Sequence, residues 1–254
     1  MLSIPFPGAD SALFLDFDGT LAELAEQPDS VVVQPDLVPI LARLSHALDG
    51  ALAIVTGRTI VEIDAFLAPL VLPVAGVHGA ERRSLNAADD WRIQVDGIGQ
   101  VAAIARALQA RHEALIVEEK SVAVALHYRQ APDLEALCLQ TMSDAAAEWP
   151  DLIVLRGKKV VEVKPRQASK GAAVKHFLGE QPFVGRIPWF VGDDVTDEAA
   201  FEVVNGLSGF AIKIGAGDTG ALYRLPDPTQ LREWLRSMAD ELEKAGRPRT
   251  ESLE

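Results

Sequence analysis

The feature that most constrains this chain is the pentapeptide Asp16-Phe17-Asp18-Gly19-Thr20, which directly follows the apolar run 12–15. An apolar run of this kind predicts a buried strand, and ligands of open parallel sheets collect beyond the carboxyl ends of the strands. The glycine lets the backbone turn sharply there without a side chain in the way. We therefore expect the two carboxylates at the functional edge of an α/β fold.

Two carboxylates one residue apart can divide the work of phosphoryl transfer. Asp16 would attack phosphorus as a covalent nucleophile, while Asp18 would protonate the departing oxygen and later activate water against the aspartyl phosphate. Thr20 is assigned to a phosphate oxygen. On these five residues alone, a calcium-binding or turn-forming acidic loop is the alternative interpretation.

A second apolar run, 51–55, ends in Thr56-Gly57-Arg58. The hydroxyl of Thr56 can donate to the transferring phosphoryl group, and backbone N–H groups of the turn at Gly57 would assist. Arg58 either joins this substrate site or pairs with an acid such as Glu62 on the helix that follows.

Lys170 stands at the start of a helical pattern and is interpreted as a catalytic cation. Two acids, a phosphate and an attacking group would repel one another, and an ammonium that bridges Asp16 and phosphate offsets this repulsion. The alternative is a solvated lysine at a helix start.

A strand pattern ending at Gly192 enters a loop with four carboxylates in the six residues 193–198. A hard cation relieves such repulsion, and Mg²⁺ with oxygen ligands suits a phosphate site. The predicted ligands are Asp193, Asp16 and the backbone carbonyl of Asp18, with Asp197 acting behind them or through water. Asp194 and Glu198 are explained by the N-terminus of the following helix.

The four motifs must meet although 114 positions separate Thr56 from Lys170. We therefore expect a catalytic core formed by residues 1–82 and 165–254, with parallel βα units, and an α+β insert over residues 83–164. Strands are expected in the insert at 91–95, 114–118, 122–128, 152–155 and 160–163, with helices at 98–111 and 133–148. The regions 86–90 and 165–167 are the expected hinges.

Composition excludes several classes of function. The formal net charge of −13 over 254 residues argues against nucleic-acid binding, which uses basic surface. One cysteine, Cys138, permits no internal disulfide and is expected to be a small core residue. The N-terminus lacks a signal-peptide pattern, and no segment has the ~20 apolar residues of a membrane helix. A cytoplasmic protein without a membrane or nucleic-acid partner is expected.

The four motifs resemble those of the haloacid dehalogenase (HAD) superfamily of aspartate-nucleophile phosphatases. Longer stretches, at 13–26, 76–81, 117–129, 161–171 and 191–198, resemble the trehalose-6-phosphate phosphatases, and the likeness extends from about Ser11 to Leu235. The resemblance implies a Rossmann-like HAD core with a parallel sheet and a smaller α+β cap inserted between the second and third motifs. It also implies Mg²⁺-dependent hydrolysis of trehalose 6-phosphate in trehalose biosynthesis, by a monomer working downstream of a trehalose-phosphate synthase.

By this resemblance Glu118, Lys120 and Glu162 are the sugar-binding candidates of the cap. The alternative for Glu118 and Lys120 is an ordinary surface salt bridge. His127 and Arg129 alternate on one face of a strand and either hold the cap together or touch the substrate.

The resemblance also places His78 and Glu81 near the sugar, although a histidine in such a turn more often braces a loop. The core motifs alone leave other activities open: a phosphatase for sucrose 6-phosphate or mannosyl-glycerate phosphate, a phosphomutase, or a non-catalytic sugar-phosphate sensor. A sensor would have no need of Asp16, Asp18, Lys170 and Asp193 together.

Overall fold

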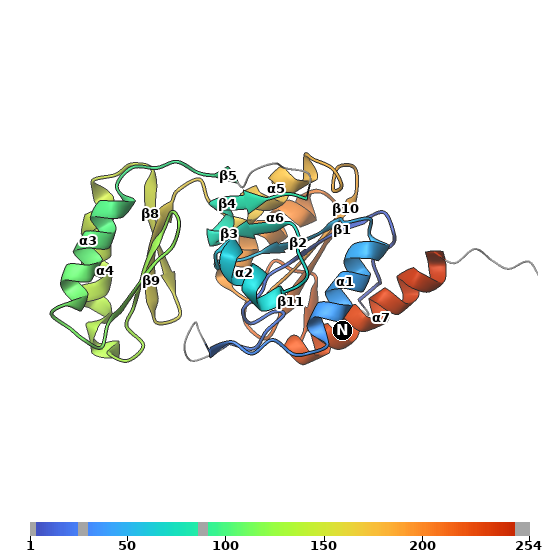
Figure 1. Ribbon diagram of the computed structural model, residues 1–254, viewed down its shortest axis with the longest axis horizontal. Coiled ribbons are helices and arrows are strands. Elements are labelled where there is room, and N and C mark those ends of the chain that lie inside the picture. Colours follow the sequence, from blue (N-terminus) through green and yellow to red (C-terminus); the bar gives the residue numbers. More distant parts are fainter. Residues whose placement is uncertain (1–3, 25–29, 86–90, 247–254) are drawn as a thin grey trace, which may run out of the picture.

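The computed structural model describes residues 4–24, 30–85 and 91–246. Its larger part is built on an eight-stranded sheet with the order β12-β11-β10-β1-β2-β3-β4-β5 (Figure 1). The strands are β1 (Ser11–Leu15), β2 (Leu52–Val55), β3 (Val74–Gly76), β4 (Glu81–Arg83), β5 (Trp91–Arg92), β10 (Ile187–Gly192), β11 (Phe210–Ile214) and β12 (Tyr223–Leu225).

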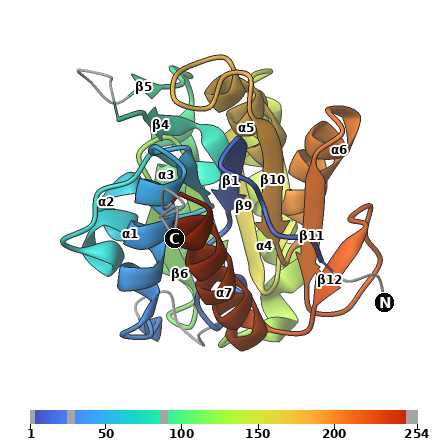
Figure 2. The same ribbon diagram turned by 90° about the vertical axis from the view of Figure 1, so that its right-hand side faces the viewer.

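The strands from β12 to β3 pair in parallel, and β4 and β5 extend one edge in antiparallel fashion. Strand β1 lies between β10 and β2, with Leu15 opposite Val191 and Ile54. Figure 2, which looks at the core from the end away from the insert, shows β1 beside β10. The residues that follow β1, β2 and β10 therefore reach one edge of the sheet together.

Helices of the core pack in pairs around this sheet. Helix α1 (Leu37–Ala47) contacts α7 (Pro228–Gly246), and α5 (Lys170–Leu178) contacts α6 (Glu198–Gly206), while α2 (Ile60–Leu67) lies against β3 and β4. Every residue of β1 is buried, as expected of a central strand covered on both faces. Phe14 stacks with Phe177 and Phe183 at ring distances of 6.0 and 5.4 Å, and each buried phenyl contributes about 1.5–3 kcal/mol.

Two helix starts carry site residues, and each start is set by a side-chain cap. Thr59 and Glu62 form a capping box at the start of α2, which fixes the end of the Thr56–Arg58 turn. The Ser169 hydroxyl accepts the Ala172 N–H at 3.0 Å, so α5 begins at Lys170. Both caps hold the chain where a functional side chain leaves the backbone.

The insert has a separate four-stranded antiparallel sheet with the order β6-β7-β9-β8. Its strands are β6 (Ile116–Glu119), β7 (Val124–His127), β8 (Leu152–Gly157) and β9 (Val160–Pro165), and its helices are α3 (Ile98–Gln109) and α4 (Glu135–Ala147). The two helices cover one face of the sheet (Figure 1), and a hydrophobic cluster between the layers contains the buried Cys138. Both the αββ rhythm and the placement of Cys138 agree with the expectation from sequence.

Three elements differ from the expectation. The strand expected at 91–95 as part of the insert is the short β5, and it pairs with β4 in the large sheet. Strand β4 also places Arg83, the expected first residue of the insert, in the core sheet. The edge strand β12 was not expected, because three residues at a sheet edge give no periodic signal. The expected hinge at 86–90 lies outside the described residues.

Short 3₁₀ turns complete the chain: η2 (Val77–Gly79), η3 (Pro132–Leu134) and η4 (Val195–Asp197). Helix α4 therefore begins at Glu135, two residues after the predicted start. Among the described residues, none of the helices is long and apolar enough to cross a bilayer.

Candidate active site

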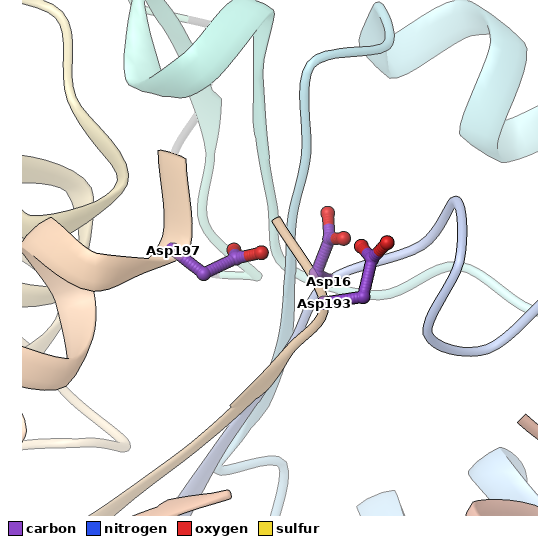
Figure 3. A group of neighbouring side chains, drawn as sticks. All are labelled: Asp16, Asp193 and Asp197. Carbon is purple, nitrogen blue, oxygen red and sulfur yellow. The ribbon is translucent and has the colours of Figure 1, made fainter. Parts of the chain in front are cut away.

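Asp16 and Asp193 lie side by side because their strands are neighbours. Asp16 follows the last residue of β1, Asp193 follows the last residue of β10, and these strands pair in parallel. Figure 3 shows both carboxylates at the strand ends, with the carboxylate of Asp197 directed toward them. Carboxylate oxygens of all three residues lie within 4.8 Å of one another. The sequence prediction that these acids meet is thus reproduced by the structure.

Lys170 supplies the positive charge at the centre of this group. Its Nζ lies 2.7 Å from Asp16 Oδ1 and 2.6 Å from Asp197 Oδ1, and only 3 % of the side chain is exposed. Burial lowers the pKa of Lys170, but the two carboxylates outweigh burial and raise that pKa above its usual range. Lys170 is therefore a permanent ammonium beside Asp16.

Asp197 supports this centre by hydrogen bonds to Lys170 and to the acidic loop. Its Oδ1 accepts from Lys170, its Oδ2 accepts the Asp194 N–H at 2.9 Å, and none of its surface is exposed. Because both oxygens already have donors, Asp197 holds Lys170 and the acidic loop in place. This geometry favours the prediction that Asp197 acts behind the direct ligands.

The carboxylates of Asp16 and Asp193 are suited to a cation. Burial raises the pKa of Asp193 to about 6, and the Asp197 carboxylate adds to the effect. Burial likewise raises the pKa of Asp16 well above its usual value, and Lys170 offsets this only in part. Asp193 Oδ1 is buried and accepts no hydrogen bond from the described residues. An oxygen-preferring divalent cation would satisfy that oxygen and favour the ionised form of both groups.

The backbone around these acids leaves space for them. Gly19 has φ +77°, and a Cβ added there would overlap the Asp193 carboxylate. The buried Lys213 on β11 donates to the backbone carbonyl of Asp193 and so fixes the start of the acidic loop. Sequence reasoning missed Lys213, although a lysine within the apolar strand 210–214 is a visible signal.

The two threonines have different surroundings. Thr56 follows β2 and lines a cavity at the strand ends; its Oγ1 accepts the Arg58 N–H at 3.2 Å, which leaves its own proton free to donate. Thr20 is fully buried, and its hydroxyl donates to Asp16 Oδ2 at 3.3 Å. The structure therefore brings the Thr20 hydroxyl to the predicted nucleophile, and its assignment to a phosphate oxygen stays a prediction.

Asp18 is held by Arg58. Arg58 Nε and NH2 donate to the two Asp18 oxygens at 2.7 and 2.9 Å, and Arg58 NH1 donates to Glu62 at 3.0 Å. The guanidinium also lies 4.9 Å from the centre of the Phe66 ring. The two readings of Arg58 are thus combined, since it pairs with Glu62 and also orients the predicted acid.

Two adjoining cavities connect the core centre to the insert. The smaller, about 340 Å³, contains Asp16, Thr56, Lys170 and Asp193. The larger, about 450 Å³, is in the usual range of small-molecule pockets and lies under the sheet of the insert. The residues shared by both linings are Asp18, Leu24, Gly57, Lys158, Asp194 and Thr196. Lys158 was not singled out in the sequence, because a lysine in a polar hairpin turn has no distinguishing pattern.

The insert lines the larger cavity with the charged residues expected from sequence. Lys120 Nζ donates to Glu162 at 2.8 Å and lies 3.9 Å from Glu118, so the Glu118–Lys120 pair is present within the cavity lining. Burial lowers the pKa of Lys120, but Glu162 and Glu118 raise it by more, and Lys120 stays charged. Arg129 lines the same cavity.

Two histidines contact the charged group formed by Glu118, Lys120 and Glu162. His127 Nε2 lies 2.8 Å from Glu118 Oε2, so His127 orients Glu118. Burial raises the pKa of Glu118, yet the His127 hydrogen bond and Lys120 bring it below its usual value. His78, from the core, lines the cavity with its Nε2 3.4 Å from Glu162. Burial lowers the pKa of His78 well below its usual value, and Lys170, Lys120 and Lys164 add to this, so its ring is neutral.

Glu81 does not reach the cavity. It is 1 % exposed, and its two oxygens accept from the Ile60 N–H at 2.7 Å and from the Ser121 hydroxyl at 2.5 Å. The expectation that Glu81 contacts the sugar is therefore wrong in this arrangement. The sequence could not show this, because strand β4 turns the side chain into the junction between core and insert.

Comparison with known proteins agrees with this architecture. The trehalose-phosphatase family model matches residues 14–228. A protein of Escherichia coli named trehalose-6-phosphate phosphatase is 42% identical over 240 residues, which cover 94% of this chain and 90% of that protein.

Solved structures show the same fold. A crystal structure of a trehalose-6-phosphate phosphatase related protein has a TM-score of 0.77 and 26% identity, covering 92% of this chain and 99% of that one. A haloacid dehalogenase-like hydrolase from B. subtilis, with a TM-score of 0.63 and 13% identity, covers 89% of this chain and 99% of its own. The sequence-based expectation of a HAD-type core is confirmed, and the chain belongs to the trehalose-phosphatase family.

Proposed function

We propose that this protein hydrolyses trehalose 6-phosphate to trehalose and phosphate through an aspartyl-phosphate intermediate on Asp16. The observation that carries the proposal is the joined pair of cavities. One holds a buried carboxylate beside an ammonium, and the other is lined by polar and charged residues of the insert. A phosphoryl group and the sugar attached to it need such adjoining sites.

The chemistry follows from the positions of Asp16 and Asp18. An Asp16 oxygen attacks phosphorus and the bond from phosphorus to the sugar oxygen breaks, while Asp18, protonated and turned out of the Arg58 pair, gives its proton to that oxygen. Asp18 then takes a proton from water, which attacks the aspartyl phosphate and releases phosphate and Asp16. Lys170 and Thr56 donate to oxygens of the transferring group throughout.

The proposed cofactor is Mg²⁺, held by Asp16, Asp193 and the backbone carbonyl of Asp18. The cation would withdraw electron density from phosphate oxygens and offset the charge of the acids. Support comes from the unpartnered Asp193 Oδ1 and from the oxygen-only donor set. Asp197 would hold Lys170 and the acidic loop in place instead of binding the cation directly.

The sugar would lie in the larger cavity. Its hydroxyls need hydrogen-bond partners once water is expelled, and Glu118, Lys120 and Glu162 offer both acceptors and donors there. His78, Arg129 and Lys158 line the same space. The insert, for which residues 83–164 were assigned from sequence, would thus determine which sugar phosphate is accepted.

Phosphate release from four substrates tests the proposal: trehalose 6-phosphate, sucrose 6-phosphate, glucose 6-phosphate and mannosyl-glycerate phosphate, each with magnesium. Trehalose 6-phosphate should be turned over with the highest kcat/KM. Preference for another sugar would keep the Asp16 chemistry and discard the assignment of the sugar-binding residues. Absence of turnover on the whole panel would contradict the proposed function.

Asp16→Asn is the catalytic control, since an amide is nearly isosteric with the carboxylate but is a poor nucleophile. Turnover should fall by about 1,000-fold or more. Asp133→Asn, at an exposed position of the insert, should leave turnover and thermal stability unchanged. A fully active Asp16→Asn variant would contradict the mechanism.

Three expectations from the sequence stay predictions. We expect a monomer, a cytoplasmic location, and a supply of substrate by a trehalose-phosphate synthase. Size-exclusion chromatography with light scattering, with and without such a synthase, checks the first and shows whether the two enzymes associate.

A further inference from the structure

The turn between β6 and β7, residues 120–123, is attached to the core at three points. Lys120 Nζ donates to the Gly57 carbonyl at 2.9 Å, and the Ser121 hydroxyl donates to Glu81 Oε2 at 2.5 Å. Ala123 is buried in a small hydrophobic cluster with Val77 and Ala80 of the core. All three contacts place the turn against the segment that follows β2 and β3.

Glu81 carries this attachment onward to helix α2. Its second oxygen accepts the N–H of Ile60, the first residue of α2, at 2.7 Å. A Cβ at Gly76 would come within 2.8 Å of Glu81 Oε1, so the carboxylate is closely confined. Ser121, Glu81 and Ile60 therefore form a continuous chain of hydrogen bonds from the insert to the helix that follows the Thr56–Arg58 turn.

The same junction contains both connections between core and insert. The hydrophobic cluster that buries Ala123 also contains Ile93 and Ala168, which lie just outside the ends of the insert's elements. The turn thus lies beside both segments that connect the insert to the core. A hydrophobic cluster gives little directional restraint, whereas hydrogen bonds to a carboxylate are directional and stronger than neutral ones.

We propose that Glu81 and Ser121 are positioning residues that set the distance between the sugar site and the phosphoryl site. Ser121 adjoins Lys120, the sugar-binding candidate, while Glu81 holds the helix that fixes the phosphate-binding turn. The pair fixes the spacing between Lys120 and Thr56 in this arrangement of core and insert. This inference rests on the proposed function for the identity of the two sites and for the kinetic test, while its hydrogen-exchange test does not.

Ser121→Ala removes the hydroxyl and nothing else, at an exposed position where folding is not threatened. We expect KM for trehalose 6-phosphate to rise about tenfold, the equivalent of one lost hydrogen bond. The kcat/KM for p-nitrophenyl phosphate, which has no sugar to place, should stay within twofold of the unmodified protein. Ser143→Ala on α4 is the matched control and should match the unmodified protein on both substrates. Equal losses on the two substrates, or no loss on either, would overturn the proposal.

Glu81 offers a rescue test. In Glu81→Gln the amide oxygen can accept the Ile60 N–H while the amide nitrogen donates to the Ser121 oxygen, so both hydrogen bonds of the chain are kept. Only the ion pair with Arg92, whose Nε lies 3.5 Å from Glu81 Oε2, is lost. This variant should resemble the unmodified protein, whereas Glu81→Ala should reproduce the KM effect of Ser121→Ala and lower stability as well. A Gln variant as impaired as the Ala variant would contradict a positioning role.

Hydrogen exchange separates this inference from the proposed function, because it needs no substrate. Amides of residues 118–124 and 59–63 should exchange faster in Ser121→Ala than in Ser143→Ala, while those of β10 and β11 should not change. Unchanged exchange at both segments would overturn the proposal whichever sugar phosphate the unmodified protein hydrolyses. Failure of the substrate panel alone would overturn only the proposed function.

Discussion

Arg58 donates hydrogen bonds to both carboxylate oxygens of Asp18, at 2.7 and 2.9 Å, and so fixes the orientation of that carboxylate. A lysine cannot reproduce this two-pronged geometry. In Arg58→Lys one oxygen loses its donor, so the carboxylate is less well oriented to take a proton from the attacking water. We expect kcat to fall about tenfold with a smaller change in KM. Steady-state kinetics measure this, and Glu62→Gln, which leaves the Asp18 pair intact, is the control. A larger effect on KM than on kcat would instead mark Arg58 as a substrate-binding residue.

Lys170 forms ion pairs with two buried carboxylates, so its removal should affect stability as well as activity. Lys170→Met leaves Asp16 and Asp197 without their cation, and breaking a buried ion pair in this way costs about 3–5 kcal/mol. Urea unfolding with and without magnesium measures the loss of free energy of unfolding. Lys175→Met, exposed on the same helix, should cost little. If the two variants were equally stable, the charge pairing described for Lys170 would be wrong.

The Thr20 hydroxyl should matter through Asp16 alone. Thr20→Val keeps the shape of the buried side chain but removes the donor to Asp16 Oδ2, at a cost of about 1–3 kcal/mol. Thr20→Ser restores the hydroxyl and should recover most of the loss in kcat. Comparison of kcat and thermal stability for the pair checks this, and a Val variant with normal kcat would show that the contact does not assist the nucleophile.

His78 gives the protein a specific response to acid. Its pKa in the folded protein lies well below its usual value, because of burial and then of neighbouring lysines, so the folded state binds fewer protons than the unfolded state. The contribution of the neutral His78 ring to the free energy of unfolding is complete above the pKa of the unfolded state, about 6.5. It is lost as the pH falls toward the pKa of the folded state.

His78→Asn removes this dependence and suits the backbone, since φ at this position is +55° and asparagine tolerates that region. Between pH 7 and pH 5 the midpoint of thermal unfolding should fall less in His78→Asn than in the unmodified protein. Contributions from the acids of the catalytic centre are common to both proteins and cancel in the comparison. Parallel pH curves would show that His78 keeps its ordinary pKa.

Asp193→Asn tests the cation site without touching the nucleophile. An amide oxygen is a weaker ligand than a carboxylate, and we expect the magnesium concentration for half-maximal activity to rise at least about tenfold. Asp194→Asn, whose side chain caps the η4 turn, should change this value much less. Activity that survives chelation by EDTA would argue against a metal requirement altogether.

Much of this arrangement could be predicted from sequence where one local pattern sufficed. The buried strands β1, β2, β10 and β11 are apolar runs, and Asp16, Thr56 and Asp193 follow the first three of these directly. The parallel pairing then brought the motifs together as expected. The resemblance to the trehalose-phosphatase family, carried by long motifs, is confirmed by the family match.

Side-chain direction within a turn could not be predicted in the same way. Thr20 and Glu81 have the residue types of a binding site, but the backbone turns both inward, to Asp16 and to the Ile60 N–H. Strand β5 was assigned to the insert because sequence order cannot show which sheet a two-residue strand joins. The contacts of Glu81 and β5 join residues that are distant in sequence or in another element, which no local pattern encodes. The Thr20–Asp16 contact spans only four residues, but it depends on the direction of a side chain within the turn.

The pairing of β1 with β10 joins Ser11 to Ile187, residues 176 positions apart (187 − 11 = 176). During synthesis the strand that precedes Asp16 therefore emerges from the ribosome long before β10 exists, although its other neighbour, β2, follows soon after it. The insert, whose strands and helices pair locally, can form before β10 is made and is available to pair with β1. We expect nascent chains that stop before β10 to contain a protease-resistant insert and a protease-sensitive amino-terminal segment, so that the phosphatase centre is among the last parts of the protein to exist.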